Sequence, residues 1–173
     1  MKKWMIFLVA GLASTAQAEN EVPNLTFNGS IIAEGCDVAV ASENQTVHIG
    51  DFSVAVFSGT GSVSSAKNFE INLENCVGKG SITFSGESNT DNGALLALTN
   101  ATGEGDTASG VAIEILDLNS GAPQPLPLGQ ASSLYTLKSG DNTLRYQLRY
   151  KATQNIVTPG SANAVMYFDM LYQ

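Results

Sequence analysis

The sequence predicts an all-β protein, because three of its features favour strands over helices. Apolar and polar residues alternate over short runs, as in 69–73, where Phe69, Ile71 and Leu73 share one side of an extended chain. Gly, Asn, Asp, Ser and Pro separate these runs at short intervals. Helical periodicity is hard to find after residue 18. We therefore expect many short strands joined by turns.

The first 18 residues have the pattern of a secretory signal peptide. Lys2 and Lys3 precede an apolar segment at 4–12, and small residues follow it up to Ala18. This apolar segment is too short to cross a bilayer as a helix, and no later segment has the roughly 20 apolar residues that crossing requires. We expect export without membrane insertion, and one domain in the 155 residues that remain of 173.

The segment 25–31 alternates like a strand but has no obvious hairpin partner beside it. Leu25, Phe27, Gly29 and Ile31 would face one side, and the polar residues between them would face the other. This segment is either an ordinary first strand of its own domain or a strand that pairs elsewhere.

Two cysteines, Cys36 and Cys76, remain after the signal peptide. Disulfides persist in exported proteins, so we expect the two residues to be bonded to each other. Free thiols with a redox role are the alternative, but the sequence lacks the Cys-x-x-Cys spacing that favours such chemistry.

The remaining runs predict a sandwich of two sheets, with an immunoglobulin-like arrangement. Proline removes an amide donor, so the segment containing Pro123, Pro125 and Pro127 is expected at a sheet edge or in a connection. Trp4, within the signal peptide, is the single tryptophan, so the buried tryptophan of antibody domains is absent. The candidate strands are 31–33, 36–40, 46–49, 69–73, 81–85, 95–98, 111–116, 133–137, 143–153 and 162–172.

Charge and composition exclude several classes of function. Without Lys2 and Lys3, six basic residues face sixteen acidic ones, which gives a net charge of −10 and argues against nucleic-acid or anionic-membrane binding. The single histidine, His48, is expected to face solvent, and no Gly-x-Ser-x-Gly sequence accompanies it. We therefore expect no catalytic residue, no cofactor and no metal site. The acidic side chains of Glu70, Glu74, Glu114 and Asp117 are expected to be solvated.

The last candidate strand has a continuous apolar face and is expected to keep a free edge. Unpaired edges recruit other strands, so segment 25–31 of one molecule could pair with this strand in another molecule, or in its own. The residues of this face are Gly160, Ala162, Ala164, Met166, Phe168, Met170 and Tyr172.

In the order and spacing of such features along the chain, the sequence resembles the fimbrial (pilus) subunits assembled by the bacterial chaperone-usher pathway. The matching features are Gly29 seven residues before Cys36, the cysteine pair, the run at 95–98, Gly160 fourteenth from the end, and Tyr172 next to last. Within the family, the sequence is most similar to the minor adaptor subunits of type 1 fimbriae, and a major rod subunit is the alternative.

The resemblance implies an incomplete immunoglobulin-like β-sandwich that lacks its last strand, so that the core lies open along a groove. In this family a periplasmic chaperone lends the missing strand, and at the outer-membrane usher the extension of a neighbouring fimbrial subunit replaces it. The implied organisation is a signal peptide at 1–18, a donor-strand extension at 19–32 and a pilin domain at 33–173, exported through the periplasm to the cell-surface fimbrium.

Transferred residue by residue, Leu25, Phe27, Gly29 and Ile31 match the donor strand, and residues 160–172 match the strand that lines the groove and binds the chaperone. Pro23 could extend the donor segment but donates no amide hydrogen bond. The alternative is a self-contained secreted or periplasmic binding module, for example for carbohydrate. A tip adhesin would need a further receptor-binding domain, for which 155 residues leave no room.

Overall fold

The computed structural model describes residues 35–100 and 106–173. The predicted signal peptide, the donor residues Leu25, Phe27, Gly29 and Ile31, and the candidate strand 31–33 lie outside the described residues. None of the described helices is long and apolar enough to cross a membrane.

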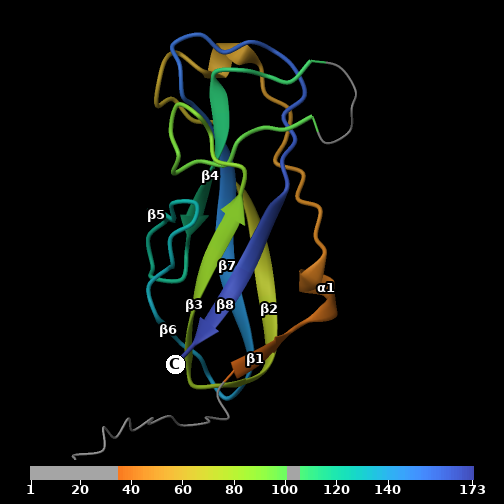
Figure 1. Ribbon diagram of the computed structural model, residues 1–173, viewed down its shortest axis with the longest axis vertical. Helices are drawn as coiled ribbons and strands as arrows, with labels where there is room; N and C mark the ends of the chain where they lie inside the picture. Colours follow the sequence, from red (N-terminus) through yellow and green to blue (C-terminus); the bar gives the residue numbers. More distant parts are fainter. Residues whose placement is uncertain (1–34, 101–105) are drawn as a thin grey trace, which may run out of the picture. The chain divides into compact units, whose positions relative to one another are not determined.

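Two antiparallel sheets form a sandwich, as the sequence predicts (Figure 1). One sheet has five strands in the order β1-β2-β7-β4-β5, and the other has three in the order β6-β3-β8. The strands are β1 Gly35–Val38, β2 Lys67–Val77, β3 Lys79–Gly86, β4 Val111–Asp117, β5 Gln124–Pro125, β6 Tyr135–Thr136, β7 Gly140–Ala152 and β8 Met166–Tyr172. Two short helices, α1 Val40–Glu43 and η1 Val54–Val56, lie between β1 and β2.

The core lies between the sheets and is built from the alternating residues of the central strands. Ile71 and Leu73 of β2 and Ile82 of β3 are almost fully buried. An aromatic cluster joins the two layers: the ring of Phe84 lies 5.0 Å from that of Tyr146 and 6.4 Å from that of Phe168, in edge-to-face geometry. Because this geometry suits aromatic pairs, the cluster fixes β3, β7 and β8 relative to one another.

The disulfide between Cys36 and Cys76 is present, which confirms the predicted pairing. It ties β1 to the far end of β2, where Gly35 pairs with Val77. The prolines also lie as predicted, since Gln124–Pro125 forms the edge strand β5 beside β4.

Two expected strands are not regular strands. Residues 46–49 do not pair, because side chains occupy the edge of β2 beside them: Ser42 Oγ accepts from the Asn72 amide, and Gln45 Nε2 donates to the Glu70 carbonyl. Residues 95–98 make only isolated bridges, from Leu96 to Ser88 and to Ile113, and Leu96 exchanges two backbone hydrogen bonds with Ile113.

Two of the four carboxylates expected in solvent are buried, so that expectation was wrong for Glu114 and Asp117. Glu114 accepts hydrogen bonds from Arg149 and Lys151 at 2.7 and 2.6 Å. Asp117 accepts from the hydroxyl of Tyr135 at 2.7 Å and from the amide of Asn119. Charged or polar donors that satisfy a carboxylate in this way offset the cost of removing it from water.

Candidate functional site

Strand β8 has a free edge among the residues that the structure describes. It pairs along its length with β3, from Met166 beside Gly86 to Tyr172 beside Gly80, and no described strand lies against its other edge. The strand begins at Met166 rather than at 162, because the preceding residues pair elsewhere: Asn163 bridges to Thr99, and Ser161 bridges to Thr107.

The side chains of β8 that point toward the core are covered less than those of its neighbours. Met166, Phe168, Met170 and Tyr172 stay half-buried, whereas Ile82 and Phe84 of β3 are fully buried. The four residues pack against the core, and they lie on the strand whose other edge no described strand covers. The predicted groove residues of this strand therefore share one incompletely covered face.

Tyr172 joins β8 to β1 at the carboxyl end of this face. Its hydroxyl donates to the Cys36 carbonyl at 3.1 Å, and its ring lies next to Gly35, 3.8 Å from where a β-carbon would be. Burial raises the pKa of Tyr172 above its ordinary value, so the phenol stays protonated and keeps donating. The chain thus enters the described domain beside the end of β8.

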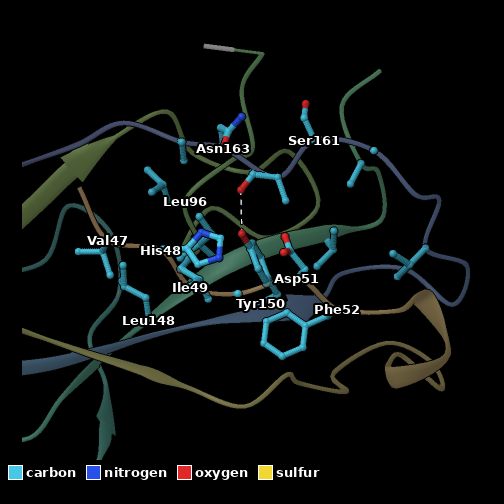
Figure 2. A pocket seen from close by; sticks show the side chains of 18 of the residues that line it. Val47, His48, Ile49, Asp51, Phe52, Leu96, Leu148, Tyr150, Ser161 and Asn163 are labelled. Carbon is cyan, nitrogen blue, oxygen red and sulfur yellow. Dashed lines mark hydrogen bonds between the residues drawn. The ribbon is translucent and has the colours of Figure 1, made fainter. Parts of the chain in front are cut away.

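At the other end of β8 the face opens into a cavity of about 930 Å³ (Figure 2). Its walls are the segments 45–54 and 157–166, and its floor includes Leu96, Leu148 and Tyr150. Ala162 and Ala164 lie in one wall, where their small side chains fill little of the space. We call this cavity, together with the half-buried face of β8, the groove.

Two polar groups of the groove were not foreseen from the sequence. Figure 2 shows the hydroxyl of Tyr150 donating to the Ala162 carbonyl, at 2.8 Å. Burial, and then the nearby carboxylate of Asp51, raise the pKa of Tyr150. The Oγ of Ser161 is buried without a hydrogen-bond partner among the described residues. A buried hydroxyl without a partner costs about 1–3 kcal/mol, so an added donor or acceptor would be favourable here.

Gly160 and His48 lie at the groove but outside β8. A β-carbon at Gly160 would clash with the backbone of Asp106 and Ala108, so close packing of two loops requires this glycine. His48 is exposed, as predicted, and its ring lies at the wall of the cavity (Figure 2).

The fold and the groove together define an immunoglobulin-like β-sandwich with a disulfide and an edge strand, β8, whose outer edge no described strand pairs with. The chain belongs to the fimbrial protein family: the family model described as Fimbrial protein matches residues 25–173. Membership confirms the prediction of a fimbrial subunit, which is a structural component of extracellular surface fimbriae and not an enzyme.

Individual comparisons agree with this assignment. The chain is 45% identical over 148 residues to the uncharacterized fimbrial-like protein YcbU of Escherichia coli (strain K12), with 84% of this chain and 81% of that protein covered. It is 35% identical over 184 residues to Fimbrial subunit type 1 of Salmonella typhimurium, with 99% and 98% covered. A solved structure of a chaperone-usher pilus has the same fold, with a TM-score of 0.65, 24% identity, and coverage of 91% and 99%.

Proposed function

We propose that this fimbrial subunit polymerises by donor-strand exchange. Segment 25–31 of one subunit pairs with the free edge of β8 in another and inserts its apolar residues into the groove. A periplasmic chaperone lends a strand to the same edge beforehand, and the exchange takes place at the outer-membrane usher. The free edge of β8, with its half-buried apolar face, is the observation that carries this proposal.

The energies suit a stable contact between subunits. Leu25, Phe27 and Ile31 would each contribute roughly 1.5–3 kcal/mol on burial, before the backbone hydrogen bonds are counted. Gly29 lies on the same side of the segment as these three residues but has no side chain to bury. Exchange of one strand for another requires no catalytic residue, because the final pairing needs only to bury more apolar surface than the first.

Strand direction supports pairing between molecules over a self-contained domain. Gly35 and Tyr172 lie together, so β8 ends where the extension begins. An extension that folded back from Gly35 into its own groove would run parallel to β8. A strand from another molecule can run antiparallel to β8, and antiparallel pairing is slightly more stable per residue. The folded-back strand would be antiparallel to β1, but β1 has only four residues, whereas β8 has seven. Its pairing with β8 therefore counts for more in the comparison.

Purification from the periplasm tests the proposal. We expect a chaperone to copurify with the mature chain, with its strand beside 166–172. Deletion of 19–31 should leave that complex intact and abolish incorporation of the variant as a donor, because β8 is untouched. Replacing the donor side chains at Leu25 and Phe27 by serine should act like the deletion, whereas changing the intervening Thr26 to serine is the matched control.

A stable, non-polymerising monomer without any chaperone would contradict the proposal and favour the self-contained binding module. Loss of chaperone binding on deletion of 19–31 would contradict the separation of donor and acceptor surfaces.

The position in the fibre is a finer point of the same proposal. The family resemblance noted from the sequence implies a minor, adaptor position, and a rod position is the alternative. Immunogold labelling of isolated fimbriae distinguishes them: an adaptor gives label at the tip, and a rod subunit gives label along the length.

A further inference from the structure

A tight turn lies between β3 and the floor of the groove. Asn92 and Leu95 close this turn, because the Leu95 amide donates to the Asn92 carbonyl at 3.0 Å. Gly93 and Ala94 lie between them, and the three residues 92–94 are exposed to solvent. Leu96, which follows the turn, belongs to the floor of the groove. The fold thus presents an Asn-Gly pair to water in a segment that continues into the groove.

The side chain of Asn92 is held at its oxygen but not at its nitrogen. Its Oδ1 accepts from the Ala94 amide at 3.1 Å, and its Nδ2 makes no hydrogen bond within the part of the chain that the structure describes. The amide of Gly93 also donates to no described group. Because Gly93 has no side chain, nothing on its own α-carbon hinders the approach of its nitrogen to the Asn92 carboxamide.

We propose that Asn92 is a site of spontaneous deamidation. The Gly93 nitrogen loses its proton to water and attacks Cγ of Asn92, and the new bond between these two atoms closes a ring. Nδ2 takes up a proton and leaves as ammonia, which gives a succinimide. Water then adds to a carbonyl of the ring and opens it, so that the product is aspartate or isoaspartate.

The turn favours the ring-closing step. As the nitrogen attacks, negative charge develops on Oδ1 of Asn92. The Ala94 amide already donates to that atom, so a donor stands where the charge will appear. The reaction does not depend on strand exchange, and its test is therefore independent of the proposed function.

Either product alters the turn. Each adds a negative charge next to Asp91, whose Oδ2 accepts from Thr153 Oγ1 and Gln154 Nε2 at 2.9 Å. In isoaspartate the backbone runs through the former side chain, which adds one carbon to it and removes the Asn92 carbonyl from the main chain. The hydrogen bond from Leu95 then loses its backbone acceptor, and we expect the turn to open beside the groove.

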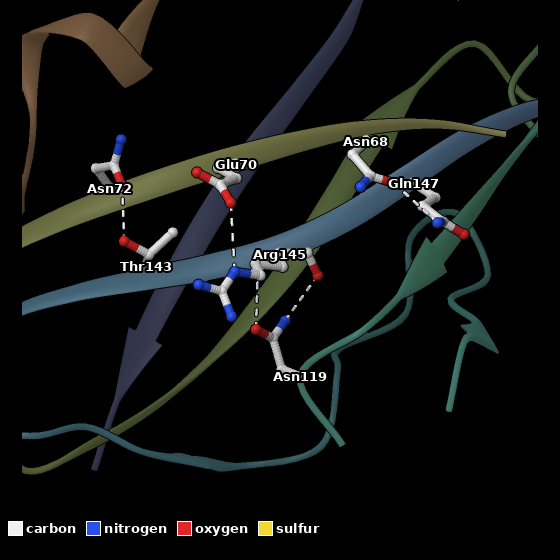
Figure 3. Close-up of polar contacts among 7 residues, drawn as sticks. All are labelled: Asn68, Glu70, Asn72, Asn119, Thr143, Arg145 and Gln147. Carbon is white, nitrogen blue, oxygen red and sulfur yellow. Dashed lines mark hydrogen bonds and ion pairs between the residues drawn. The ribbon is translucent and has the colours of Figure 1, made fainter. Parts of the chain in front are cut away.

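Asn119 offers a matched comparison, because its side chain is held at both ends (Figure 3). Its Oδ1 accepts from the Arg145 amide at 2.9 Å, and its Nδ2 donates to the Arg145 carbonyl at 3.1 Å and to Asp117 at 2.8 Å. Ser120, the next residue, is exposed. Ser120→Gly therefore makes another Asn-Gly pair, but one whose carboxamide cannot turn toward the following nitrogen without breaking these bonds.

Peptide mapping of the aged protein tests the site. The mature chain, as purified from the periplasm, is incubated at neutral pH, and its peptides are followed by mass spectrometry. Deamidation raises the mass of a peptide by about 1 Da, and an isoaspartate methyltransferase identifies the isoaspartate product. Mapping also separates Asn92 from Asn28, which precedes a glycine as well. We expect Asn92 to react at least about tenfold faster than Asn119 does in Ser120→Gly.

Gly93→Ala shows whether the unhindered nitrogen matters. The variant is expected to fold, because a β-carbon at Gly93 would meet nothing within 4 Å and the φ of Gly93 is not positive. An unchanged thermal midpoint checks this. Conversion of Asn92 should slow at least about tenfold in this variant.

Three results would overturn the inference. The first is no mass increase at Asn92 under conditions in which a synthetic peptide of residues 88–96 deamidates. The second is an equal rate at Asn92 and at Asn119 of Ser120→Gly, since sequence and not the turn would then set the rate. The third is an unchanged rate of hydrogen exchange at the Leu95 amide of the isoaspartate form, where we expect a rise of at least about tenfold.

Discussion

Removal of the disulfide should destabilise the domain by an amount that follows from the length of the loop it closes. Cys36 and Cys76 are separated by 40 residues, and the chain-entropy model gives about 4 kcal/mol for a loop of this size. That corresponds to nearly a thousandfold change in the ratio of folded to unfolded protein. The bond also holds β1, three of whose four residues pair with β2.

Urea unfolding of the mature chain, saturated with a synthetic peptide of residues 19–33, measures this effect. We compare the oxidised protein, the reduced protein and the double variant Cys36→Ala/Cys76→Ala. Free energies extrapolated to zero urea are compared, since an unfolded chain without the cross-link exposes more surface and raises the slope. The peptide should also dissociate faster from the two forms without the bond, because β1 is less firmly held beside Tyr172.

The reduced protein keeps both sulfur atoms and is the control for lost side-chain packing. If it equals the oxidised protein in stability to within 1 kcal/mol, loop closure does not stabilise the fold and the reasoning is refuted. If the double variant alone is unstable, packing of the buried Cys76 is the cause instead.

Three further predictions concern single residues. Burial by itself would raise the pKa of Glu114, but hydrogen bonds from its basic partners hold that pKa below its ordinary value of 4.5. The contribution of the ionised Glu114 to the free energy of unfolding is therefore complete above pH 4.5 and is lost as the pH falls further. Glu114→Gln should therefore cost about 2 kcal/mol at pH 7 and almost nothing near pH 2, and an equal cost at both would contradict the assignment. Tyr172→Phe should lower the free energy of unfolding by about 1 kcal/mol, because the hydrogen bond to Cys36 is lost, and Tyr172→Ala should lower it several times more. Urea midpoints of the two variants measure the difference. Equal losses would show that the ring does not pack. Gly160→Ala should lower the thermal midpoint through a cost of about 1–3 kcal/mol, because its β-carbon meets the backbone of Asp106, and an unchanged midpoint would show that the two loops can separate.

Alternation along the sequence predicts the central strands well, because a strand with one face in the core must bury every second residue. The prediction holds for Phe69, Ile71 and Leu73, which are buried in β2. It fails at 46–49, where the same alternation is present but the side chains of Ser42 and Gln45 already hydrogen-bond to the edge of β2. Alternation describes which face of a segment is apolar, and says nothing of whether a backbone edge is available.

Residue type and spacing were enough to predict the sandwich of two sheets, the Cys36–Cys76 bond and the apolar face that ends at Tyr172. The start of β8 at Met166, the burial of Glu114 between Arg149 and Lys151, and the close approach of a neighbouring loop to Gly160 became visible only in the folded chain. These features depend on contacts between segments far apart in the chain, and local pattern carries no information on which distant backbone or charge a residue will meet.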